Sequence, residues 1–217
     1  MLKHFFAAKQ KWYRQHIYQT FQTYTMVPRQ SYLNNLELAE RIRYFEGTIV
    51  ECGVWKGGMI AGMAKLLGHQ REYFLFDSFE GLPPAEPIDG VRALKWQATP
   101  SNPHYHNNCK ADYEEATKAM ELAGIVNAHI YKGWFDQTLV QYPKEPIALL
   151  RLDADWYAST LLCLEHLFDY VISDGIIILD DYYTWDGCAR AVHDFLSARN
   201  ATARLYTYNN SVCWIKK

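Results

Sequence analysis

The chain has 217 residues, of which 49% are hydrophobic and 21% are charged, and its net charge is −2 at pH 7. A chain of this length and composition can bury one sizeable core, which excludes a disordered protein. Because no run of lysine and arginine exceeds two residues, we expect no nucleic-acid partner.

The sequence also indicates a compartment. No apolar run approaches the roughly 20 residues that a membrane span needs. The first residues lack the apolar core and the cleavage site of a signal peptide. The five cysteines are scattered and form no CxxC pair, which is typical of reduced thiols. We therefore expect a cytoplasmic protein with no membrane partner.

Residues 1–24 carry apolar and aromatic side chains at spacings of three and four, which predicts an amphipathic helix. A break at Pro28 precedes a second predicted helix over residues 32–44. We interpret residues 1–45 as an N-terminal helical cap and residues 46–217 as the main domain. The aromatic face of the first helix is wider than burial against one small domain requires, so we also expect a homo-oligomer interface there.

From residue 46 onward, short apolar runs alternate with helical patterns. Strands are predicted, in chain order, at residues 48–52, 72–76, 128–131, 147–152 and 175–179. Helices are predicted between and after them, at residues 58–67, 111–123, 159–170 and 185–198. Such an alternation indicates a parallel sheet that is buried on both faces. A long loop over residues 78–109 interrupts it, and a loop of this length favours an active-site lid.

The end of the chain follows a different pattern. Residues 203–208 and 211–215 flank Asn209 and Asn210, which predicts an antiparallel hairpin. A Rossmann-like α/β fold with a mostly parallel seven-stranded sheet and a C-terminal antiparallel hairpin is typical of class I methyltransferases rather than dehydrogenases. Ligands of such sheets bind at the carboxyl ends of the strands, near the point where strand order reverses.

The first two predicted strands end in residues that suit an adenosine ligand. Gly53 permits a sharp turn and close approach of a ligand, and Glu51 is an acid suited to the amino group of an amino-acid-like ligand. Asp77 ends the second strand, 20 positions after Gly57, where an acid suits two ribose hydroxyls. The alternatives are a solvated Glu51 and an Asp77 that caps the turn at Ser78.

The fourth and fifth strands end in acids, namely Asp153, Asp180 and Asp181. The tips of adjacent parallel strands converge, and carboxylates that crowd together raise one another's pKa unless a cation lies between them. Oxygen ligands without histidine or cysteine favour Mg²⁺ or Ca²⁺. Such an ion lowers the pKa of an acceptor hydroxyl. The alternative is that these acids only cap the helices that follow.

Five motifs together resemble the macrocin O-methyltransferase-like family of class I S-adenosylmethionine-dependent methyltransferases. They are, in chain order, ECGVWKGG at 51–58, DSFEGLP at 77–83, KGWF at 132–135, RLDAD at 151–155 and DDY at 180–182. The resemblance extends from about residue 26 to about residue 195. It implies a Mg²⁺-dependent O-methyltransferase that uses S-adenosylmethionine and acts on a hydroxyl, often of a sugar. Residues 46–217 would then be the S-adenosylmethionine-binding domain.

The resemblance also implies roles for individual positions. Carried over, Glu51 and Gly53 face the methionine part of the cofactor, and Asp77 faces the ribose. Ser78, Gly133 and Trp134 then flank the adenine, and the segment at Met26 closes over the cofactor. The metal ligands are Asp153, Asp180 and Asp181. The arrangement is also similar to that of catechol O-methyltransferase, but position 156, where that enzyme has a catalytic lysine, is tryptophan here.

Asp153 lies nearest the expected line of methyl transfer, so we count it both with the cofactor-binding residues and as a candidate general base. His104 and His106, in the long loop, are alternative bases, although loop histidines are also common without a role. Two other hypotheses stay open. One is a metal-free N- or C-methyltransferase, and the other is a non-catalytic adenosine-ligand-binding or assembly protein. The expected acceptor is a small hydroxylated molecule.

Overall fold

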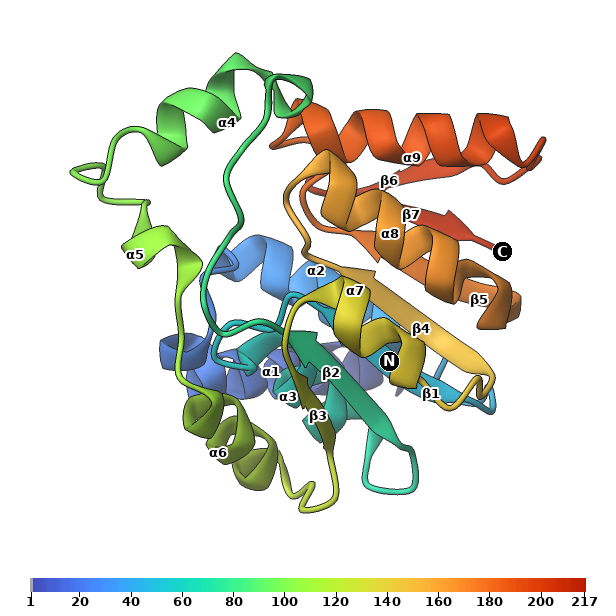
Figure 1. Ribbon diagram of the computed structural model, residues 1–217. Helices are drawn as coiled ribbons and strands as arrows, with labels where there is room; N and C mark the ends of the chain where they lie inside the picture. Colours follow the sequence, from blue (N-terminus) through green and yellow to red (C-terminus); the bar gives the residue numbers. More distant parts are fainter. Residues whose placement is uncertain (1) are drawn as a thin grey trace.

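The computed structural model describes residues 2–217, with side chains from residue 8 onward. Its centre is a seven-stranded sheet in the order β3-β2-β1-β4-β5-β7-β6 (Figure 1). The strands are β1 (Thr48–Cys52), β2 (Tyr73–Asp77), β3 (His129–Lys132), β4 (Ile147–Leu152), β5 (Val171–Leu179), β6 (Leu205–Tyr208) and β7 (Val212–Lys216). All pairs are parallel except those made by β7, which runs antiparallel to β5 and β6. The predicted fold class is confirmed.

Helices cover both faces of the sheet (Figure 1). One face packs against α1 (Leu2–Phe21), α2 (Arg29–Glu40), α3 (Gly58–Leu67) and α6 (Tyr113–Ala123). The other face packs against α7 (Phe135–Thr138), α8 (Tyr157–Leu167) and α9 (Asp186–Ala198). Successive strand residues alternate between the two cores, as Ile49 and Val50 of β1 do. Burial on both faces explains why the strands are continuous apolar runs.

The N-terminal helices share a core with the sheet. Ile17 and Phe21 of α1 are buried together with Tyr32 of α2, and the Tyr32 hydroxyl donates to the carbonyl oxygen of Gly58 at 2.8 Å. The second helix spans Arg29–Glu40 rather than residues 32–44, because the carbonyl of Pro28 already accepts the Tyr32 amide. The division of the chain near residue 45 stays a prediction.

The long loop over residues 78–109 contains helical segments that the sequence pattern did not predict. They are η2 (Pro87–Asp89), α4 (Gly90–Gln97) and α5 (His106–Cys109). All residues of α5 have positive φ, so this segment is a left-handed turn. Figure 1 shows α4 and α5 standing away from the sheet, beyond the ends of its strands. We refer to residues 78–109 as the lid.

The C-terminal hairpin forms as predicted, with Asn209 and Asn210 at positive φ between β6 and β7. β5 is longer than predicted, because it begins at Val171, and Ser173 and Asp174 separate its first two residues from the apolar run. Among the described residues, no helix combines the length and the apolar character that crossing a bilayer requires.

Candidate active site

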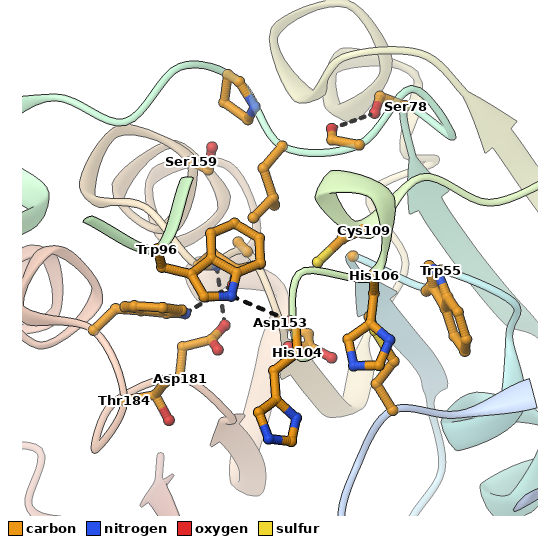
Figure 2. A pocket seen from close by; sticks show the side chains of 18 of the residues that line it. Trp55, Ser78, Trp96, His104, His106, Cys109, Asp153, Ser159, Asp181 and Thr184 are labelled. Carbon is orange, nitrogen blue, oxygen red and sulfur yellow. Dashed lines mark hydrogen bonds between the residues drawn. The ribbon is translucent and has the colours of Figure 1, made fainter. Parts of the chain in front are cut away.

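A cavity of about 790 Å³ lies where β1, β2, β4 and β5 end and the lid passes over them (Figure 2). Most of the predicted site residues line it, namely Met26, Gly53, Asp77, Ser78, His104, His106, Trp134, Asp153 and Asp181. Three predicted residues do not, namely Glu51, Gly133 and Asp180. The sheet therefore gathers side chains that are far apart in the sequence into one pocket. Glu51, Gly133 and Asp180 lie outside the pocket lining, and we call them the second layer.

Gly53 brings the ends of β1 and β4 together. Its φ is +83°, which favours glycine, and its amide donates to the Phe76 carbonyl oxygen at 2.8 Å. A side chain at Gly53 would overlap the carbonyl oxygen of Asp153. β1 and β4 are central neighbours from which the chain proceeds to opposite sides of the sheet, so the glycine turn lies at the topological switch point.

Asp77 holds together the loop that follows β1 and the loop that follows β2. One carboxylate oxygen accepts the amides of Val54 and Trp55 at 2.7 and 2.8 Å, and the other accepts the Phe79 amide at 2.7 Å. Burial raises the pKa of Asp77, and these three amides oppose the rise. The side chain therefore caps its own turn, the alternative that the sequence left open, while it also lines the pocket.

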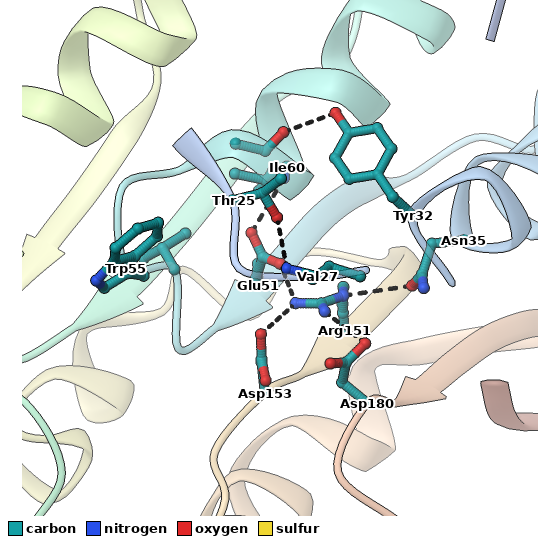
Figure 3. Close-up of polar contacts among 12 residues, drawn as sticks. Thr25, Val27, Tyr32, Asn35, Glu51, Trp55, Ile60, Arg151, Asp153 and Asp180 are labelled. Atoms are coloured by element: carbon teal, nitrogen blue, oxygen red, sulfur yellow. Dashed lines mark hydrogen bonds and ion pairs between the residues drawn. The ribbon is translucent and has the colours of Figure 1, made fainter. Parts of the chain in front are cut away.

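Behind the pocket, one buried arginine contacts three carboxylates (Figure 3). Arg151 is 1% exposed, and its guanidinium lies 2.5 Å from Glu51, 2.9 Å from Asp153 and 2.6 Å from Asp180. Glu51 also accepts the amide of Ile60, near the start of α3, at 3.2 Å. Glu51 is thus buried next to the switch point rather than exposed in the pocket.

Three carboxylates contact this one arginine, and the pKa values of two of them are raised. Burial raises the pKa of Glu51 to about 8, against the lowering effect of Arg151. Burial likewise raises the pKa of Asp180 to about 6, which Arg151 again opposes and Asp153 reinforces. One guanidinium cannot neutralise three carboxylates, so the remaining negative charge favours binding of a proton or a cation here.

Asp153, Asp155 and Asp181 form the acidic cluster that faces the cavity. Each offers one oxygen atom, and these atoms all lie within 4.8 Å of one another. The Asp155 amide donates to the Asp181 carboxylate at 3.0 Å, and burial together with the neighbouring carboxylates raises the pKa of both side chains. Three hard oxygen donors that repel one another fit a divalent cation such as Mg²⁺.

This cluster differs from the predicted ligand set at one position. The predicted Asp180 is held by Arg151 and lies outside the cavity lining, whereas Asp155 takes a place in the cluster. Asp155 has a φ of +56°, which turns the chain back toward β5. Its position two residues after Asp153, on the same loop, was the only signal in the sequence that could have indicated it.

Trp96 and Trp185 line the cavity next to the acidic cluster, with Trp156 buried behind them. Trp156 and Trp185 pack edge to face at 5.2 Å, and Trp96 of α4 contacts Trp185 at 5.8 Å between ring centroids. The indole of Trp185 donates to the Asp155 carboxylate at 2.8 Å. The sequence pattern did not indicate this cluster, because Trp96 lies in the lid, far along the chain from Trp156 and Trp185.

His104 and His106 both lie on the lid side of the cavity, and their rings are 6.3 Å apart (Figure 2). The indole of Trp96 donates to the backbone carbonyl of His104 at 3.2 Å, which holds this part of the lid against α4. Neither ring forms a hydrogen bond with the acidic cluster among the described residues. Their role as alternative bases stays a prediction.

Comparison with known proteins finds a family match over almost the whole chain. The Macrocin-O-methyltransferase (TylF) family profile matches residues 6–217. A 36% identical relative over 160 residues is the 8-demethyl-8-(2,3-dimethoxy-alpha-L-rhamnosyl)-tetracenomycin-C 4'-O-methyltransferase of Streptomyces olivaceus, with 69% of this chain and 58% of the relative covered. The demethyldecarbamoylnovobiocin O-methyltransferase of Streptomyces niveus is 30% identical, with 77% and 65% covered.

Solved structures of methyltransferases share the fold of this chain. The O-methyltransferase NovP superposes with a TM-score of 0.75 at 25% identity, covering 89% of this chain and 82% of that one. The calicheamicin methyltransferase CalS11 shares the fold, with a TM-score of 0.68 at 19% identity over 96% of this chain and 92% of that one. The chain spans about three fifths of the length of the curated relatives it matches. By its motifs, fold and family match, it belongs to the TylF macrocin-O-methyltransferase family.

Proposed function

We propose that the protein is an S-adenosylmethionine-dependent O-methyltransferase that needs a divalent cation and acts on a hydroxyl of a sugar or a sugar-bearing natural product. The observation that carries this proposal is the meeting of the Gly53 turn with the Asp153, Asp155 and Asp181 cluster in one cavity. The names of two relatives support the acceptor class. One is the rhamnosyl-tetracenomycin-C 4'-O-methyltransferase described above, and the other is the mycinamicin III 3''-O-methyltransferase of Micromonospora griseorubida.

The cofactor would lie along the ends of β1, β2 and β3. Asp77 and Ser78 line the cavity beside the Gly53 turn, and Met26 and Trp134 approach from either side. In this arrangement Asp77 serves twice, because it shapes the turn and faces the ribose position. Glu51 and Gly133 act from the second layer. The Gly133 amide donates to the Asp77 carbonyl oxygen at 2.9 Å, which fixes the adenine-side loop.

Asp153 and Asp181 belong both to the predicted ligand set and to the observed cluster, so we propose them as metal ligands. The third carboxylate is Asp180 according to the sequence motif and Asp155 according to the distances, and variants of the two distinguish these assignments. A divalent cation bound here would lower the pKa of the acceptor hydroxyl. Asp153 lies closest to the Gly53 turn and is our candidate for taking the hydroxyl proton, with the two lid histidines as alternatives.

The experiment follows labelled methyl transfer from S-adenosylmethionine to a panel of glycosylated acceptors, in excess EDTA and then with Mg²⁺ restored. We expect methyl ethers on oxygen, loss of turnover in the chelator and recovery with Mg²⁺. Undiminished turnover in EDTA would show a metal-free methyltransferase. No transfer to any acceptor, despite tight cofactor binding, would favour a non-catalytic binding protein.

Two further predictions concern the whole protein. Self-association through the N-terminal segment is consistent with exposed aromatic residues there, since Trp12 of α1 is 66% exposed and Tyr44, in the turn after α2, is 92% exposed. A cytoplasmic location without membrane or nucleic-acid partners also remains a proposal.

A further inference from the structure

One face of α4 contributes to the wall of the cavity. The lining residues on and just after this helix recur at helical spacing, and they are Val91, Arg92, Lys95, Trp96 and Thr99. The opposite face is anchored, since Ala93 is fully buried against the tryptophan cluster. The orientation of α4 is therefore fixed, and it directs Arg92 and Lys95 toward the cavity.

Arg92 and Lys95 are the only lysine or arginine side chains that line the cavity in the described part of the chain. Neither forms an ion pair with a described acidic side chain, whereas Lys56, on the glycine turn, pairs with Glu115 at 2.8 Å. Both are exposed, so neither bears a large desolvation cost. These two cations are thus available to a ligand that enters the cavity.

The cavity is polarised between its two ends. All its acidic lining residues follow the strands, namely Asp77, Asp153, Asp155 and Asp181, and both cations are on the lid. One indole connects the ends. Trp185 donates to the Asp155 carboxylate at 2.8 Å, and the guanidinium of Arg92 lies 5.4 Å from the Trp185 ring. Trp185 therefore contacts both the acidic cluster and Arg92, so a ligand lying along this indole would reach both ends of the cavity.

We propose that the acceptor is an anionic sugar, in which the hydroxyl to be methylated lies at the acidic cluster and a phosphate ester or diphosphate binds Arg92 and Lys95. This inference rests on the proposed function and adds the substrate class. A phosphate group carries close to two negative charges near neutral pH. Two cations one helical turn apart match that charge, and an arginine can bind two phosphate oxygens at once. An uncharged glycoside would leave both cations without a partner.

The test is a titration of the protein saturated with S-adenosylhomocysteine. Three probes are compared by calorimetry: glucose 1-phosphate, UDP-glucose and the neutral methyl α-glucoside. EDTA is present, so that phosphate cannot bind through a cation on the acidic cluster. We expect the phosphorylated probes to bind at least about tenfold more tightly than the neutral glucoside, and this difference to shrink as salt is added.

The double variant Arg92→Gln with Lys95→Gln should lose that difference and keep its affinity for S-adenosylhomocysteine. The matched control is Lys118→Gln, which removes an exposed cation on α6, outside the cavity and without an ion pair to any described side chain, and should change nothing. Tight binding of UDP-glucose alone would identify a nucleotide-linked sugar, and equal binding of glucose 1-phosphate would identify the phosphate as sufficient.

Equal affinity for charged and neutral probes, or an unchanged preference in the double variant, would overturn the proposal. If the double variant binds S-adenosylhomocysteine more weakly, the proposal is tested in the wild-type protein alone. Its preference for the phosphorylated probes should then decrease as salt is added, and a preference that salt leaves unchanged would overturn the proposal. Failure of S-adenosylhomocysteine to bind the wild-type protein would instead count against the proposed function, and the sugar probes can then be titrated alone.

Discussion

Arg151 shows which part of the site the sequence could indicate and which part it could not. Acids at the ends of β1, β4 and β5 were predicted from the positions of the strands. The pairing of Glu51 with Arg151 depends on the register of β1 and β4, in which these residues are direct neighbours. Register between distant strands is a tertiary property, so sequence reasoning assigned Glu51 to the cofactor and gave Arg151 no role.

At Gly53 we expect replacement by alanine to destabilise the fold and abolish binding of S-adenosylhomocysteine. The methyl group would overlap the Asp153 carbonyl and force β1 away from β4. Gly124→Ala is the matched control, because Gly124 also has positive φ, +91°, but has open space around it. The control should cost about 1–2 kcal/mol, and Gly53→Ala clearly more, as measured by urea unfolding. Similar costs for both would show that the close approach is unimportant.

Asparagine variants of Asp155 and Asp180 distinguish the two proposed ligand sets. If Asp155 is the third ligand, Asp155→Asn should weaken Mn²⁺ binding about tenfold or more, whereas Asp180→Asn should mainly disturb the ion pair with Arg151. Mn²⁺ binding can be followed by electron paramagnetic resonance. The reverse result would support the ligand set from the sequence motif. Unchanged Mn²⁺ binding in both variants would contradict a site at this cluster.

Among the elements, α4 is the longest helix that the sequence pattern missed. The helix has only eight residues, begins at a glycine and has a single fully buried side chain, Ala93. Its packing partners, Trp156 and Trp185, lie more than fifty positions away along the chain. A helix held mainly by such contacts carries little periodic signal of its own. The central strands β1, β2 and β4, by contrast, are mostly apolar, and their predicted bounds agree with the structure to within one residue.

Asp89 attaches the lid to the body of the protein. It is buried, and its carboxylate accepts the Tyr157 amide of α8 at 2.7 Å and the Glu86 amide at 2.8 Å. Asp89→Ala leaves these amides without their partner, so we expect faster hydrogen exchange across α4, about tenfold or more. Affinity for S-adenosylhomocysteine should change little. The control Glu165→Ala removes an exposed acid of α8, and equal exchange in both variants would refute the anchoring role.

At the scale of the whole molecule, the buried acids predict an unusual dependence of stability on pH. The pKa of Glu51 is raised to about 8 and that of Asp180 to about 6, both mainly by burial. A carboxyl group whose pKa is higher in the folded state binds its proton more tightly there, so its stabilising effect is lost as pH rises through the folded pKa.

In EDTA we therefore expect the melting temperature to fall between pH 5.5 and pH 8.5, by about 5 °C or more. Mg²⁺ should reduce the fall, because it replaces protons among the carboxylates. Glu51→Gln, which resembles the protonated side chain, should flatten the curve. A melting temperature that rises over this range in EDTA would contradict the assigned direction of these pKa values.

The fold class was predictable because local patterns and global packing agree, from the apolar parallel strands to the two asparagines of the final hairpin, whereas the strand order comes from the structure. That topology places the Gly53 turn beside the acidic cluster, and the proposed function depends on a methyl donor binding there. Calorimetric titration of the wild-type protein with S-adenosylhomocysteine tests this most directly. We predict one site per chain, with roughly micromolar affinity. No heat with this ligand, together with clear binding of a nicotinamide dinucleotide, would contradict the account.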